Sequence, residues 1–298
     1  MKLIRPVTID DTVFQSSDVP ENDYTAWAGG TTYAASDRVI VTTGYHKIYE
    51  SVQGSNVGND PTTDDGTWWI EVSSTNRWKM FNAVVQEQTV QAAQIVTTLQ
   101  SSTVVNSMAF LNVEATTIEI TVTDSVEGVV YDETFNMTSY SGIQDWYSYF
   151  FEPIIRKDQL AITDLPPYAN AEIEITINSS ADAKIGALVM GQFANLGLSQ
   201  HGASLSIIDY STKTTDAQGR VTITDGPYAD KMEVDVVLDT SAIGQANATL
   251  SSLRTTPAVW IAEDNNDDLV IYGYYREFDI ILSNPTISRI SLEIEGLV

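Results

Sequence analysis

Alternating apolar and polar residues constrain the fold of this chain more than any other feature. Residues 117–123 read TIEITVT and residues 172–177 read EIEITI, and both runs alternate strictly. Successive side chains of a strand point to opposite faces, so a period of two predicts a strand with one buried face. Strand-like runs separated by turn residues cover 104–113, 117–124, 128–136, 159–163, 171–178 and 185–192. Several short strands with regular turns predict a β-sandwich of jelly-roll type over residues 82–196.

The region 197–298 combines strands with one helix. Apolar residues at helical spacing predict a helix over 243–254, and Ser241 is expected to cap its N-terminus. Strand-like runs precede this helix at 204–210, 220–224 and 231–239 and follow it at 258–262, 269–276 and 289–295. This order predicts a C-terminal α+β domain, barrel-like, with a single helix.

Aromatic residues recur from Tyr24 to Trp78 in a setting rich in Gly, Thr and Asp. Short β-branched runs at 38–42 and 47–52 flank a turn signal at Gly44-Tyr45. A unit of roughly 55 residues is near the size at which one core barely suffices, so stacked rings must supply much of this core. Residues 1–81 are therefore expected to form an N-terminal arm and a small three-stranded aromatic module. The whole chain is predicted to be mainly β, with module boundaries near residues 82 and 197.

The adjacent Trp68 and Trp69 are expected to face opposite sides of a strand. We therefore expect one of these rings to be buried together with Trp27 and Tyr33, and the other to be exposed. An exposed ring can stack on a sugar or on a partner protein. The candidate residues for a carbohydrate or partner contact are Tyr45, Tyr49, Trp68 and Trp69.

Charge and rare residue types restrict the possible functions. The formal net charge is −25, and a field of this sign repels nucleic acid and anionic membranes. The sequence has no cysteine, which removes disulfides, thiol catalysis and thiolate metal sites, and it has only two histidines, His46 and His201. No apolar run is long enough for membrane insertion, and residues 1–6 lack a signal-peptide core. We expect a protein made in the cytoplasm and not exported by the general secretory route.

Catalytic motifs are missing from the sequence. It contains no Gly-x-Ser-x-Gly elbow, phosphate-cradling Gly loop or His-Glu-x-x-His helix, and 40 acidic residues give no basis for choosing a glycosidase pair. The acidic loops 60–66 and 264–268 lack the spacing of a calcium-binding loop, so we expect solvated turns, no metal and no cofactor. Both histidines are expected at surface or packing positions. The chain is therefore not expected to be an enzyme.

Residues 143–151, IQDWYSYFF, concentrate aromatic rings in one place. Such a cluster can form a platform on which a glycan stacks. The alternatives are a plug at one end of the sandwich or an interface with a partner protein, and we favour these two over the platform.

The aromatic module resembles the carbohydrate-binding module of family 5/12, the small chitin-binding type. The matching positions are Trp27, Tyr33, Asp37 with Val39, Tyr49 with Ser51, Pro61, and Trp68 or Trp69. Chitin-binding members usually carry exposed aromatics in the loop after the second Tyr, whereas here this loop is 52–58, VQGSNVG. The resemblance therefore implies the module fold, with a structural or docking role preferred over sugar binding.

The C-terminal region resembles a domain of bacteriophage tail and baseplate proteins. The residues that carry this resemblance are 206–211, the helix end at Leu253, 256–261, 272–278 and 291–297. The phrase TNRWKMFN at 75–82 also looks like one that follows carbohydrate-binding-like modules in phage tail proteins. The resemblance implies a virion protein in the tail that assembles with itself, as a trimer or hexamer, and with other tail or baseplate proteins.

Three classes of function follow from the sequence. The first is a structural component of a phage tail, in the baseplate or tail-tip region. The second is a glycan-binding protein of the virion that contacts a cell-surface receptor, and the third is an accessory module of a polysaccharide hydrolase. The oligomeric state separates the first two, because a ring favours the tail component and a strict monomer favours a detached binding module.

Overall fold

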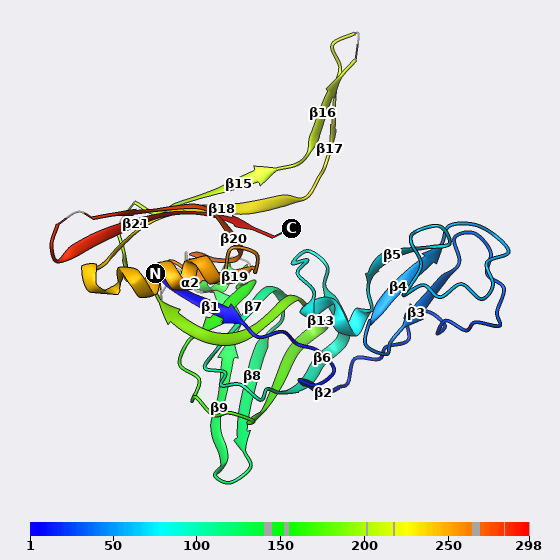
Figure 1. The fold of residues 1–298 in the computed structure, drawn as a ribbon, viewed down its shortest axis with the longest axis horizontal. Coiled ribbons are helices and arrows are strands. Elements are labelled where there is room, and N and C mark those ends of the chain that lie inside the picture. The colour runs from blue at the N-terminus through cyan, green and yellow to red at the C-terminus, as the bar shows by residue number, and fades with distance from the viewer. Residues whose placement is uncertain are drawn as a thin grey trace.

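The computed structural model describes residues 1–139, 145–151, 155–200, 202–216, 218–263, 269–282 and 284–297. The protein is mainly β, as predicted, and within these ranges α2 (Ile243–Ser252) is the one helix of more than two turns. Figure 1 shows a central sandwich-like part, a C-terminal sheet above it and the aromatic module to one side. A long hairpin projects from the C-terminal sheet away from the rest of the chain.

The central part contains most of the predicted strands. Its elements are β2 (Phe14–Ser17), β6 (Thr89–Gln100), β7 (Ser107–Glu114), β8 (Thr117–Asp124), β9 (Gly128–Asn136), β10 (Thr138–Ser139), α1 (Trp146–Phe151), β11 (Ile155–Arg156), β12 (Gln159–Ile162) and β13 (Glu172–Asn195). The alternation along β8 has the predicted effect, because Ile118, Ile120 and Val122 are all buried in the same core. This core also receives Phe110 and Met137.

The two strands predicted at 171–178 and 185–192 are one continuous strand, β13, of 24 residues. The polar residues between them, read as a turn, form an irregularity in which the register against β6 shifts between Asn178 and Asp182. A bulge of this kind bends a strand without ending it. The first half of β13 therefore pairs with β8, and the second half pairs with β7.

The first strand of the chain joins the central and C-terminal parts. β1 (Lys2–Pro6) pairs with β13 on one edge and with β19 (Ala258–Ile261) on the other, which makes one continuous sheet. Leu3 and Ile4 of β1 are both fully buried. A Cβ at Gly191 would collide with the carbonyl oxygen of Arg5, so glycine permits this close pairing. The first strands of the expected segment 1–81 thus belong to the large sheet, since β2 likewise pairs with β6.

The C-terminal part is an antiparallel sheet covered on one face by α2. Its elements are β14 (Leu198–Ser199), β15 (Ser204–Asp209), β16 (Thr212–Thr215), β17 (Val221–Thr224), β18 (Tyr228–Asp239), η2 (Thr240–Ala242), α2, β19, β20 (Val270–Ile281) and β21 (Ile287–Gly296). Leu250 of α2 packs with Trp260 and Val236 in the core between helix and sheet. The expected cap at Ser241 is wrong, because Ser241 lies within η2 and the helix begins after Ala242 without a side-chain cap.

The aromatic module has the predicted three strands, β3 (Arg38–Val41), β4 (Lys47–Ser51) and β5 (Trp69–Ser74), in the order β3-β4-β5. Its small core contains Tyr33, Val39, Tyr49 and Trp69. The rings of Tyr33 and Trp69 meet edge to face with centroids 5.1 Å apart. Ring contacts thus supply much of the core, as expected from the shortage of aliphatic residues. A 3-10 helix, η1 (Asn76–Phe81), leads from the module into the central part.

Candidate functional site

The structure separates the four predicted contact residues of the module. Trp69 is 2% exposed and Tyr49 is also buried, so both rings lie inside the module rather than on its surface. The module needs both rings for its core, and the Trp69 indole N–H donates to the carbonyl of Asn59 at 2.9 Å. Tyr45 remains available as a contact residue, because its side chain is 50% exposed in the β3–β4 turn.

Trp68 differs from the expectation of one buried and one exposed ring. It is half-buried and packs against the module core, because it lies before β5 and the alternation of strand side chains does not apply to it. Trp27, which we expected to be buried, is also only half-buried against the same core.

The carboxylate of Asp64 holds the loop that precedes β5. Its Oδ2 accepts hydrogen bonds from the backbone N–H groups of Gly66, Trp68 and Trp69, at 2.9, 3.0 and 3.0 Å. Desolvation acts to raise the pKa of Asp64, but these N–H donors outweigh it and hold the pKa below its usual value. The loop 60–66 therefore uses its carboxylates within its own turns. Within the described ranges no group of three or more His, Asp or Glu is placed to hold a metal ion.

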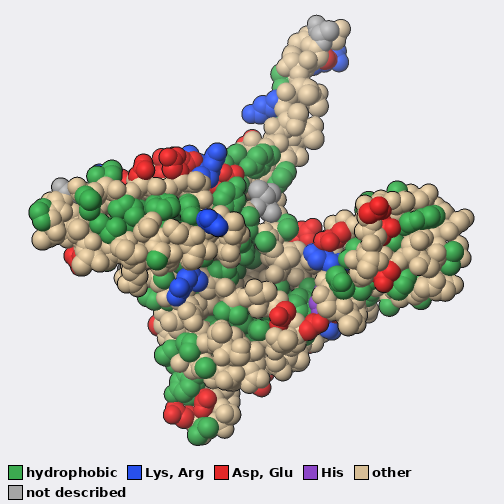
Figure 2. Space-filling view, viewed as in Figure 1, with side chains coloured by type: hydrophobic (Ala, Val, Ile, Leu, Met, Phe, Trp, Pro, Cys, Tyr) green, Lys and Arg blue, Asp and Glu red, His purple; other side chains and the backbone are tan. Residues whose placement is uncertain are grey.

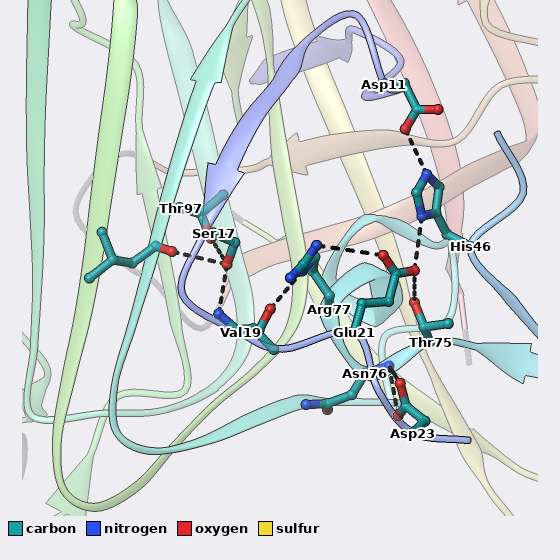
Figure 3. A network of polar contacts seen from close by, with 11 residues as sticks. Asp11, Ser17, Val19, Glu21, Asp23, His46, Thr75, Asn76, Arg77 and Thr97 are labelled. Carbon is teal, nitrogen blue, oxygen red and sulfur yellow. Dashed lines mark hydrogen bonds and ion pairs between the residues drawn. The ribbon is translucent and has the colours of Figure 1, made fainter. Parts of the chain in front are cut away.

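A cleft of about 430 Å³ lies where the module meets the central part, and we call it the junction cleft. Its lining includes Asp11, Tyr45, His46, Trp78 and Phe81, from the loop after β1, the β3–β4 turn and η1. Segments far apart in the sequence therefore meet in it. Figure 3 shows the polar contacts beside this cleft.

His46 is held on three sides. Its Nε2 lies 2.6 Å from Asp11 Oδ1 and its Nδ1 lies 2.9 Å from Glu21 Oε1. Its ring stacks on the indole of Trp78, with centroids 3.9 Å apart and planes 15° apart. Both ring nitrogens and one ring face of His46 are therefore occupied by contacts within the fold, which makes His46 a clamp between the β3–β4 turn, the loop after β1 and η1.

Glu21 connects His46 to η1. The side chain of Glu21 is only 8% exposed, and besides His46 it lies 3.5 Å from Arg77 Nη1. It also accepts a hydrogen bond from Thr75 Oγ1 at 2.8 Å. Arg77 Nε in turn donates to the carbonyl of Val19 at 2.6 Å (Figure 3). The same carboxylate therefore ties the β3–β4 turn to the segment that enters the central part.

Apolar residues of η1 seal the junction. Trp78 contacts Phe14 and Phe81, with ring centroids 5.1 and 5.4 Å apart. Met80 is buried in the core of the central part, and its N–H donates to Thr89 Oγ1 at 3.0 Å. The linking phrase TNRWKMFN at 75–82 therefore contains a 3-10 helix whose Trp78 and Met80 are buried. The composition of this phrase alone did not reveal that Glu21 and Asp11 would meet it.

A second cleft, of about 430 Å³, lies between the central and C-terminal parts and contains Asp158, Asp230 and Tyr272. Desolvation raises the pKa of Asp230, and the nearby charge of Asp158 raises it further. Burial likewise raises the pKa of the Tyr272 phenol. Two interacting carboxylates in a cleft are the feature that a hydrolase would need, and the sequence did not single out this pair.

A projecting hairpin, which we define as residues 204–216 and 218–228, exposes apolar side chains on the C-terminal part. β15 lies against β18 near the body, whereas β16 and β17 pair, among the described residues, only with each other and stand clear of the molecule (Figures 1 and 2). All residues of β16 and β17 are exposed. Val221 and Ile223 have 62% and 58% of their side chains exposed.

The aromatic cluster predicted at 143–151 is described only from residue 145 onwards. Within α1, the rings of Trp146, Tyr147, Phe150 and Phe151 are all exposed. These four rings therefore do not plug the end of the sandwich within one copy. His201 and the acidic loop 264–268 lie outside the described residues.

No protein-family model matches this chain, and no curated protein matches it. In the part of the chain that the structure describes, no helix is long and apolar enough to cross a membrane.

Proposed function

We propose that this protein is a structural component of a bacteriophage tail, in the baseplate or tail-tip region, that assembles with copies of itself and with other tail proteins. The observation that carries the proposal is the projecting hairpin. The resemblance of the C-terminal region to tail and baseplate domains supplies the particular setting.

The hairpin has the properties of an assembly element. A two-stranded ribbon on its own is at best marginally stable in water, because it buries little apolar surface. β16 and β17 also leave two unpaired edges, which are sites for pairing with another chain. Apolar side chains on such a ribbon gain stability when a neighbouring subunit covers them. The hairpin is therefore best explained as a segment that is completed by assembly.

The junction supports a peripheral position for the aromatic module. Glu21, His46 and Trp78 hold the module against the central part through buried polar and stacking contacts. A module fixed in this way keeps a constant position relative to the assembling C-terminal sheet. The alternative function, contact with a cell-surface glycan, rests on the exposed ring of Tyr45 at the junction cleft.

Native mass measurement of the full chain tests the proposal. We expect a ring of several copies, in accord with three-fold or six-fold assembly. The triple variant Ile207→Ser, Val221→Ser, Ile223→Ser should remain folded and lose the oligomer, since these side chains are exposed in the single copy. The matched control is Val126→Ser with Val129→Ser, exposed apolar residues of another hairpin, which should assemble normally. A strict monomer at all concentrations would contradict the proposal.

A hydrolase function is tested separately at the second cleft. We expect no release of reducing ends from chitin, peptidoglycan or capsule-type polysaccharide. Release that exceeds a buffer blank and disappears in Asp230→Asn or Asp158→Asn would favour the hydrolase alternative.

A further inference from the structure

We propose that the projecting hairpin of one copy docks on the opposite end of the C-terminal sheet of the next copy, so that the chains associate head to tail. This inference rests on the proposed self-assembly and names the receiving surface. That surface is the apolar tip, which we define as Ile281, Leu282 and Ile287 at the β20–β21 end.

The hairpin and the apolar tip lie at opposite ends of one sheet. β18 begins at Tyr228, where the hairpin leaves the body, and ends at Asp239, which pairs with Ile287 of the tip. At about 3.4 Å per residue, this 12-residue strand separates the two surfaces by roughly 40 Å. Figure 1 shows the hairpin projecting from one end and β20–β21 closing the other. The hairpin therefore cannot cover the tip of its own chain.

The apolar tip is as exposed as the hairpin. Leu282 has 70% of its side chain exposed, and Ile281 and Ile287 are also exposed. Figure 2 shows apolar side chains along this end of the C-terminal part. Two separate exposed apolar surfaces on one chain have a simple joint explanation, in which each surface covers the other in a neighbouring copy.

Lys213 of the hairpin is complementary in charge to two aspartates of the tip. Directly opposite residues of an antiparallel pair share a face, so Lys213 lies on the same face of the hairpin as Ile223. On the tip, Asp239 lies opposite Ile287, and Asp279 lies two residues before Ile281 on the same face. Both aspartates are exposed.

Neighbouring charges leave these aspartates available to the hairpin. Arg289, the cation on the same face of the tip, is paired with Asp235. Lys213 is thus placed to meet Asp239 or Asp279 when Val221 and Ile223 contact the tip.

The use of two different surfaces determines the symmetry of the assembly. A two-fold dimer joins the same surface on both copies, whereas a hairpin-to-tip contact joins different surfaces. Repetition of such a contact closes a ring if the rotation permits and otherwise extends a filament. The inferred contact therefore gives a ring or a filament and excludes an isolated two-fold dimer.

Cysteine cross-linking tests the contact directly, because the chain contains no cysteine of its own. Ile223→Cys and Leu282→Cys are made as separate full-length variants, mixed, oxidised and separated on a non-reducing gel. We expect a disulfide-linked dimer in the mixture and little cross-linking in either variant alone. The double variant carries both ends, so it should give a ladder, which ends at the ring size if the contact closes a ring and continues if it extends a filament. Ile223→Cys mixed with Val126→Cys is the matched control and should not cross-link.

Other outcomes overturn the inference in distinguishable ways. A dimer of Ile223→Cys alone would show hairpin-to-hairpin contact. Oligomers in native mass measurement without the Ile223–Leu282 disulfide would place the receiving surface elsewhere while leaving self-assembly intact, whereas monomers would remove the proposed function itself.

Charge reversal gives a second measurement that does not depend on disulfide geometry. Lys213→Glu should weaken assembly, and Asp239→Lys with Asp279→Lys should restore it in the same chain. If the variant with all three reversed charges does not recover assembly, the apolar tip is not the receiving surface.

Discussion

At the residue scale, Trp69 shows why the module tolerates few changes. Its ring is buried against Tyr33, and its N–H is bonded to Asn59. Trp69→Ala should destabilise the module by about 3–5 kcal/mol, because it removes a large ring that the small core cannot replace. Hydrogen exchange of β3–β5 in the full chain measures this loss locally. Trp68→Ala, at the half-buried neighbour, should reduce the stability of the module clearly less. Equal reductions in the two variants would show that both rings are core residues.

Asp64 makes the stability of the module depend on pH. Its pKa in the folded chain is depressed, so its contribution is present above the pKa of the unfolded chain, about 4. This contribution is lost as the pH falls through the lower folded value. We expect protection of β5 to decline in the parent chain as the pH falls below the unfolded pKa of about 4. Asp64→Asn should be less stable at neutral pH and less sensitive to acid; an unchanged pH profile would assign the acid response to other carboxylates.

At the element scale, η1 and the β3–β4 turn act as one unit through Glu21. Glu21→Ala leaves His46 and Arg77 without their shared carboxylate and should destabilise the junction by about 1–3 kcal/mol, since these partners still reach water. Asp11→Ala is the matched control, because Asp11 also contacts His46 but its side chain is 52% exposed. Asp11→Ala should lower the stability of the junction by less than about 1 kcal/mol. The rate of limited proteolysis between β5 and β6 measures the destabilisation of the junction in each variant. Equal cleavage rates in Glu21→Ala and Asp11→Ala would contradict the role of Glu21.

Local patterns predicted elements, but not their long-range partners. The alternating run at 117–124 coincides with β8, because one buried face is sufficient to produce the pattern. The same pattern gave no sign that 171–192 forms one bent strand, since a bulge and a turn use the same polar residues. Of Trp68 and Trp69, one ring is buried as predicted, but the other is half-buried rather than exposed, because only Trp69 lies within β5.

The candidate sites were less predictable than the elements. His46 was correctly placed as a packing residue, but its partners Asp11 and Glu21 lie 35 and 25 residues away in the sequence. Nothing in the local spacing connects these three residues. The runs at 204–210 and 220–224 were predicted as strands, but β16 was not. The projection of the hairpin follows only from pairing, because among the described residues β16 and β17 pair solely with each other.

At the scale of the whole molecule, β1 joins two parts that have separate cores. Leu3 packs in the core under α2, whereas Ile4 packs in the seam with Val259 and Val189. The first strand thus completes the sheet that carries the hairpin. Loss of this strand would expose both β13 and β19 as free edges.

Net charge determines how the proposed assembly responds to salt. Each copy carries a formal charge of −25, so copies repel one another at low ionic strength. Raising the salt from about 0.01 to 0.15 M shortens the Debye length from about 30 to 8 Å and screens this repulsion. Contacts of Val221, Ile223 and Leu282 are apolar and are not screened. We therefore expect the oligomer fraction, measured by sedimentation velocity, to rise with salt over this range. A fall would show that ion pairs such as those of Lys213, rather than apolar burial, supply most of the interface.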